Sequence, residues 1–77
     1  MITINLSQMR AGQTGKIMSF DGGRGLVKRL ESMGIRCGVQ ITKVSGQIMR
    51  GPIIVRVGNT QVAIGFGMAR KILVRID

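Results

Sequence analysis

Few side chains in this 77-residue sequence could carry out acid–base chemistry. It contains no histidine, and its three acidic residues are Asp21, Glu31 and Asp77. General acid–base catalysis needs a group held within hydrogen-bonding reach of the proton that it moves. We expect Asp21 in a turn, Glu31 on a solvated helix face and Asp77 at a fraying end. None of them has a suitable partner, so the sequence predicts a protein that is not an enzyme.

The single cysteine, Cys37, excludes an internal disulfide and any site built from several cysteines. With no histidine to act as its base, it is not expected to be a nucleophile. Ferrous iron and zinc need several histidine, cysteine or carboxylate ligands that converge. Only Cys37, Asp21 and Glu31 lie near one another in the sequence. We therefore predict no catalytic residue, no metal site and no cofactor.

The glycine-rich stretch 21–25 (DGGRG) resembles a loop that cradles phosphate. It does not match the GxGxxG pattern and lacks the lysine spacing of a P-loop. We interpret it as a flexible turn before a helix. Anion contact at the start of that helix, aided by Arg24, is the alternative.

The basic residues are the strongest chemical signal. Twelve Lys or Arg against three acidic residues give a formal net charge of +9, which favours a polyanionic neighbour: nucleic acid, an anionic membrane surface or an acidic protein. Sites for single-stranded nucleic acid combine basic grooves with exposed stacking aromatics. The only aromatic residues are Phe20 and Phe66, and we expect Phe20 in the core. A basic SH3-like barrel that binds single-stranded nucleic acid is therefore the less favoured alternative.

One helix is expected within residues 25–38 (GLVKRLESMGIRCG). Its apolar residues fall on one face: Leu26, Val27, Leu30 and Met33. Gly34 should end it, because glycine adopts the left-handed conformation without a steric cost. Leu30 and Ile35 would then form the apolar pair of a Schellman motif. We expect the apolar stripe to lie on a small sheet or barrel and to close its core.

The rest of the chain reads as short strands joined by tight turns. Strand patterns cover 1–5, 14–20, 39–44, 53–57, 60–64 and 72–76, and short helical turns cover 6–9 and 68–71. Gly58 and Asn59 form a two-residue hairpin turn in which both residues are expected at positive φ. Val44 suggests either a bulge or the exit of the chain from the strand. These patterns predict a mainly β fold: a small SH3-like barrel of about five strands with one helix packed on it, and a single domain over residues 1–77.

Four segments taken together resemble the ferrous iron transport protein A (FeoA) family. They are 6–13 (LSQMRAGQ), 30–38 (LESMGIRCG), 51–58 (GPIIVRVG) leading to 62–64 (VAI), and 69–74 (ARKILV). The resemblance implies an SH3-like barrel that assists FeoB, the GTP-dependent ferrous iron transporter of the inner membrane, by regulating its G domain or helping to assemble it. The family has no fixed catalytic motif. Residues 64–69 (IGFGMA) depart from its pattern.

No charged segment followed by an apolar one opens the chain, and no apolar run approaches 18 residues. We therefore expect a cytoplasmic protein at the inner face of the membrane, where each Lys or Arg near anionic lipid contributes up to about 1 kcal/mol. The partner contacts are expected on the polar helix face and the 46–52 loop: Lys28, Arg29, Arg36, Met49 and Arg50. Self-association through an exposed strand edge is a further alternative.

Overall fold

The computed structural model describes residues 2–45 and 50–76, and within them the fold is mainly β, as predicted. In chain order the elements are β1 (Ile2–Asn5), the 3₁₀ turn η1 (Leu6–Gln8), β2 (Thr14–Phe20), α1 (Arg24–Ser32), β3 (Gln40–Ser45), β4 (Ile53–Val57), β5 (Thr60–Ile64), α2 (Phe66–Ala69) and β6 (Ile72–Ile76). The described part therefore has six strands rather than about five, because the β-prone segment at the start of the chain pairs with the last strand.

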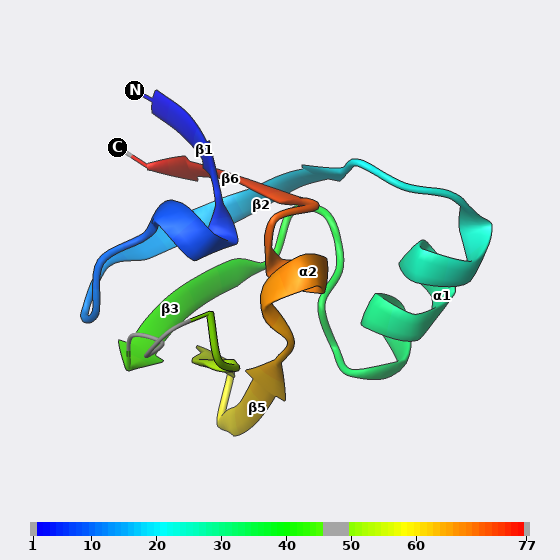
Figure 1. Ribbon diagram of the computed structural model, residues 1–77. Coiled ribbons are helices and arrows are strands. Elements are labelled where there is room, and N and C mark those ends of the chain that lie inside the picture. Colours follow the sequence, from blue (N-terminus) through cyan, green and yellow to red (C-terminus); the bar gives the residue numbers. More distant parts are fainter. Residues whose placement is uncertain (1, 46–49, 77) are drawn as a thin grey trace.

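The six strands form one antiparallel sheet in the order β1-β6-β2-β3-β4-β5. The last strand thus lies between the first two, and the labelled ends of the chain are neighbours in Figure 1. Contacts between η1 and α2 bring together the segments that follow the two edge strands, β1 and β5. The sheet consequently curls around a single core.

The core is aliphatic. The inward residues of β2, β3, β4 and β6 alternate with exposed or half-buried ones, as expected for strands with one buried face. Phe20 is half-buried and packs against the core from its edge. The fully buried apolar residues are Leu6, Met9, Ile17, Leu30, Ile35, Ile41, Ile53, Val55, Ile64, Ala69, Ile72 and Val74.

Helix α1 ends in the predicted Schellman motif. The amide of Ile35 donates to the carbonyl of Leu30 at 3.0 Å, and the amide of Gly34 donates to the carbonyl of Glu31 at 3.0 Å. Gly34 has φ +83°. Leu30 and Ile35 are both fully buried, so the apolar contact across the stop is also present.

The helix lies to one side of the strands rather than flat across the sheet (Figure 1). Of its predicted apolar stripe, Leu30 is fully buried, and Leu26 and Met33 are half-buried against the core. Val27 is half-buried but lies outside that cluster. The helix therefore closes the core through three of the four expected residues.

Two strands contain bulges. The pairing of β3 with β4 skips Val44, which confirms the bulge expected there, and the pairing of β2 with β6 skips Met18. The hairpin between β4 and β5 has the predicted two-residue loop. Only Gly58, at φ +61°, has a positive φ, so the expectation for Asn59 was wrong. Glycine at the first central position is the pattern of a type II′ turn.

The end of α1 provides a stability test with a matched control. Gly34→Ala should lower the free energy of unfolding by about 1–2 kcal/mol, because an L-residue is strained at this φ. A Cβ at Gly34 or at Gly25, inside α1, would meet no atom within 4 Å. Gly25→Ala should therefore be neutral or stabilising by up to about 1 kcal/mol. Urea unfolding measures both changes, and equal effects of the two variants would contradict the role assigned to Gly34.

Candidate contact surfaces

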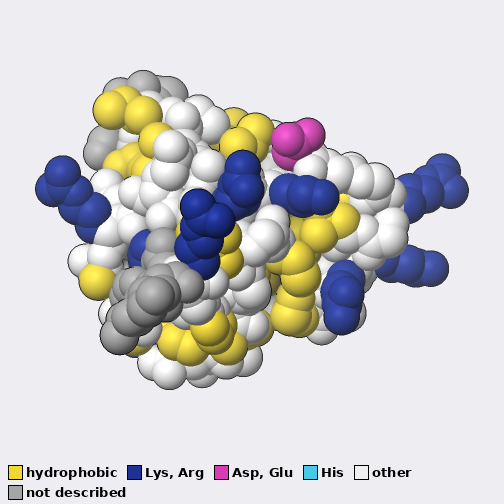
Figure 2. Space-filling view, viewed as in Figure 1, with side chains coloured by type: hydrophobic (Ala, Val, Ile, Leu, Met, Phe, Trp, Pro, Cys, Tyr) yellow, Lys and Arg dark blue, Asp and Glu magenta, His cyan; other side chains and the backbone are white. Residues whose placement is uncertain are grey.

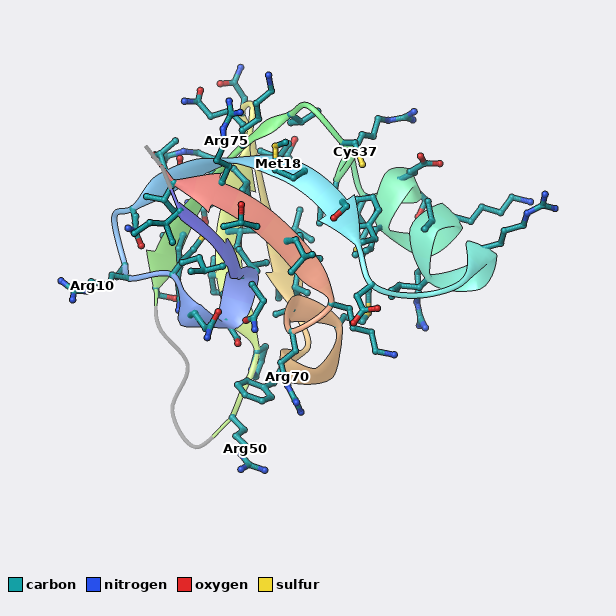
Figure 3. All side chains as sticks on the ribbon, turned by 90° about the horizontal axis from the view of Figure 1, so that it is seen from above. Arg10, Met18, Cys37, Arg50, Arg70 and Arg75 are labelled. Atoms are coloured by element: carbon teal, nitrogen blue, oxygen red, sulfur yellow. The ribbon has the colours of Figure 1, made fainter. Side chains whose placement is uncertain are left out.

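The residues predicted to contact a partner lie on two separate parts of the molecule. Lys28 and Arg29 are exposed on α1, and Arg36 is exposed in the segment that follows it. Arg50 is exposed just before β4. It lies beside α2 and away from α1 (Figure 3). Met49 lies outside the described residues.

We call Lys28 and Arg29 the helix surface. Both belong to the only helix of the described part that is longer than one turn, and that helix extends away from the strands. Figure 2 shows Lys and Arg side chains spread over the visible face, with hydrophobic side chains between them and little acidic surface. The helix surface is thus positively charged and projects from a molecule that is itself positively charged.

We call Arg50, Phe66, Arg70 and Lys71 the α2 surface. The guanidinium carbon of Arg50 lies 5.9 Å from the centre of the half-buried Phe66 ring, a distance at which a cation–π interaction is favourable. Arg50 also has φ +63°, which is uncommon for a residue other than glycine. Phe66 lies between two glycines in the sequence, and its pairing with Arg50 was not predicted.

Two hollows adjoin these surfaces. One of about 500 Å³ lies at the start of α1 and is lined by Gly22, Gly23, Arg24, Gly25, Val27, Lys28 and Glu31. Its floor is the glycine-rich stretch that we interpreted as a turn. The other, of about 360 Å³, is lined by Asn5, Asp21, Gly67, Arg70 and Lys71. Each hollow combines cations with one carboxylate.

Lys43 is the one charged residue of the described part that is buried, with 3% of its surface exposed. Its Nζ donates to the carbonyl of Met9 at 2.5 Å and reaches the carbonyl of Ser7 at 3.5 Å. Burial lowers the pKa of the ammonium below its usual 10.5. These bonds hold the η1 segment against β3, so Lys43 has a structural role. The burial of Lys43 was not predicted, although the alternation of Val39 and Ile41 with polar residues is a signal that position 43 faces inward.

No cluster of three or more His, Cys, Asp or Glu side chains that could hold a metal ion occurs among residues 2–45 and 50–76. Cys37 is free and exposed. Neither α1 nor α2, nor any other helix in the described ranges, is long and apolar enough to cross a membrane.

Comparison with known proteins shows which family has this architecture. The family model of the FeoA domain matches residues 4–76. The chain belongs to the FeoA family. An Fe(2+) transport protein A from Methanocaldococcus jannaschii is 35% identical over 69 residues, which cover 90% of this chain and 82% of that protein. The resemblance stated from the sequence is therefore confirmed, as is the link of the family to ferrous iron transport.

Solved FeoA structures confirm the fold. A crystal structure of an iron uptake regulatory protein, FeoA, superposes with a TM-score of 0.90 at 35% identity and covers 96% of this chain and 97% of that one. The FeoA of Stenotrophomonas maltophilia, solved with zinc and described as an SH3 domain protein, superposes with a TM-score of 0.79 at 22% identity and covers 94% of this chain and 89% of that one. This FeoA-family chain therefore has the SH3-like fold that was predicted.

Lys43 predicts a pH dependence of stability. Its pKa is lower in the folded chain, so between that pKa and 10.5 the unfolded chain binds more protons than the folded chain does. Its contribution to the free energy of unfolding should therefore rise as the pH is raised through this range. Urea unfolding at a series of pH values should show this rise in the wild type and in Lys16→Met, an exposed control. Lys43→Met should lack it, and the same pH dependence in all three proteins would contradict the assignment.

The contact between Arg50 and Phe66 predicts energetic coupling. In a double-mutant cycle, Arg50→Gln and Phe66→Leu should be non-additive by about 0.5–1 kcal/mol in the free energy of unfolding. Arg10→Gln removes an exposed cation that lies apart from Arg50 (Figure 3), and it should be additive with Phe66→Leu. Additivity in both cycles would show that the ring and the guanidinium do not interact in solution.

Proposed function

We propose that this chain is a non-catalytic cytosolic accessory protein of ferrous iron uptake, which binds the GTP-dependent membrane transporter FeoB and regulates or assembles it. Membership of the FeoA family supports the role in ferrous iron transport. The binding of FeoB, the location at the inner face of the membrane and the anionic lipid nearby are parts of this proposal.

The observation that carries the proposal is the helix surface. Helix α1 projects from the barrel, and both Lys28 and Arg29 are exposed on it. Exposed cations steer association with an acidic partner and add specificity more than affinity. A protein that acts by contact needs such a surface, and here it stands clear of the strands.

Arg36, Arg50 and Met49 remain part of the predicted contact set. The α2 surface adds an aromatic ring, Phe66, to the contact predicted at Arg50. Aromatic and Arg residues are enriched among the interface residues that contribute most of the binding energy. The same pairing weakens the nucleic-acid alternative. Phe20 packs against the core and Phe66 lies under Arg50, so neither ring forms an open stacking platform.

The helix surface is tested by charge reversal. Lys28→Glu together with Arg29→Glu should weaken binding to purified, detergent-solubilised FeoB by about tenfold, corresponding to roughly 0.7 kcal/mol for each of the two reversals. Transporter-dependent ferrous iron uptake in cells should fall in parallel at equal protein levels. Affinity is measured by pull-down across protein concentrations.

Lys16→Glu with Arg56→Glu is the matched control, because it makes the same change of charge on exposed residues of β2 and β4. This control should bind detergent-solubilised FeoB as the wild type does. Equal losses of affinity in the two double variants would show that binding depends on net charge and not on the helix surface. Unchanged binding by the Lys28/Arg29 variant would remove the helix surface from the mechanism.

A further inference from the structure

The outward residues of the sheet form two rows that follow from the strand register. In the first row Thr3 pairs with Arg75, Arg75 with Lys16 and Lys16 with Gln40. In the second row Thr14 pairs with Thr42, Thr42 with Arg56 and Arg56 with Gln61. Directly paired residues point to the same side of a sheet. We call these eight residues the outer sheet face.

The chain neighbours of these residues confirm that the rows point outward. Ile17, Ile41, Val55 and Val74 each lie one position along from a member of the outer sheet face, and all four are fully buried. Successive side chains of a strand point to opposite faces. The outer sheet face therefore lies on the solvent side of β1, β6, β2, β3, β4 and β5.

The outer sheet face carries one sign of charge. It has two exposed cations, Lys16 and Arg56, and one half-buried cation, Arg75. Its other members are threonine or glutamine. The two acidic residues that the structure describes lie elsewhere, Asp21 after the end of β2 and Glu31 on α1. Cations with hydroxyl and amide donors, and no carboxylate among them, suit the oxygens of phosphate esters.

A hollow of about 200 Å³ opens within this face. It is lined by Thr14, Gly15, Lys16, Gly38, Gln40 and Arg75. The hydroxyl oxygens of Thr14 and Thr42 are 2.8 Å apart, so these two side chains are held together at its border. Unlike the two hollows beside α1 and α2, this one has no carboxylate among its lining residues.

An exposed apolar side chain lies beside the cations. The bulge in β2 leaves Met18 out of the pairing with β6, and 42% of its surface is exposed. Figure 3 places Met18 and Arg75 on one side of the molecule and Arg50 and Arg70 on the opposite side. Proteins that bind the surface of a bilayer combine basic residues with apolar ones that enter the headgroup region.

We propose that the outer sheet face docks on an anionic lipid bilayer, with a headgroup phosphate in the hollow beside Lys16 and Gln40 and with Met18 at the acyl boundary. Charge complementarity selects this occupant, because the face has three cations and no acid. It lacks the aromatic side chains on which the bases of a single-stranded nucleic acid would stack. This inference rests on the proposed location at the inner face of the membrane, but the docking itself requires no transporter.

The test is co-sedimentation of the full chain with vesicles that contain no protein. Binding is expected to vesicles of phosphatidylcholine mixed with phosphatidylserine, to weaken as salt is raised, and to be absent with phosphatidylcholine alone. Lys16→Glu with Arg56→Glu should lower the affinity by about tenfold or more. Lys28→Glu with Arg29→Glu, the matched change of charge on α1, should lower it by less than about threefold.

Met18→Ser tests the apolar contact separately. It should weaken vesicle binding by about threefold or more without changing the dependence on salt. Urea unfolding of each variant confirms that it is folded. Equal losses in the two charge-reversed variants, or equal binding to both kinds of vesicle, would overturn docking through the outer sheet face, and unchanged binding by Met18→Ser would overturn the place given to Met18.

Two further binding experiments distinguish a lipid headgroup from free phosphate and from the phosphates of a nucleic acid. Inorganic phosphate that replaces chloride at constant ionic strength should displace little protein from the vesicles. The chain should bind single-stranded RNA more weakly than it binds the vesicles. Tighter binding to RNA, or displacement by dilute phosphate, would overturn the bilayer as the occupant. Because the vesicles hold no FeoB and the FeoB binding assay holds no bilayer, failure of this inference is distinguishable from failure of the proposed function.

Discussion

The close approach of β2 and β6 at Gly15 is a steric constraint on which the packing of these two strands depends. A Cβ at Gly15 would lie 2.4 Å from Cγ1 of Val74 and 2.8 Å from the carbonyl oxygen of Arg75, so a larger residue would force side chain and backbone apart. One residue further on, Lys16 pairs both with Gln40 of β3 and with Arg75 of β6. Glycine within a strand often marks a site where another backbone approaches closely. The missing side chain at Gly15 lets Val74 of β6 pack against β2 in the aliphatic core.

Filling the interior with aliphatic side chains leaves nearly all the charged groups of the described part on the outside. The exception is Lys43, whose ammonium is held by the carbonyls of Ser7 and Met9. A buried charge is costly unless it is hydrogen-bonded, and these two bonds join η1 to β3. The other cations are distributed over a projecting helix, the α2 surface and the outer side of the sheet. The cationic surfaces of the described part therefore differ in composition.

The sequence predicted the local structure closely because the period-2 alternation and the turn residues agree with the tertiary packing. The bounds of β2, β4, β5 and β6 match the predicted ranges, as does the Schellman motif at Gly34. The position of α1 beside the strands could not be predicted, since the apolar face of a helix does not tell which part of a core it covers. The contact between Arg50 and Phe66 joins residues 16 positions apart, and no local pattern encodes it. The burial of Lys43 was not predicted, because lysine is almost never buried.

The place of β6 in the sheet has a consequence for the order in which the chain can fold during synthesis. The strand made last lies between β1 and β2, the two made first, and hydrogen-bonds to both. Until residues 72–76 leave the ribosome, β1 has no partner strand, and the core residues that pack against Val74 stay exposed to solvent. The hairpin of β4 and β5 can form early because its contacts are local. We expect the barrel to close only at the end of translation of this domain, with a newly made β1 that must be kept from pairing elsewhere until then.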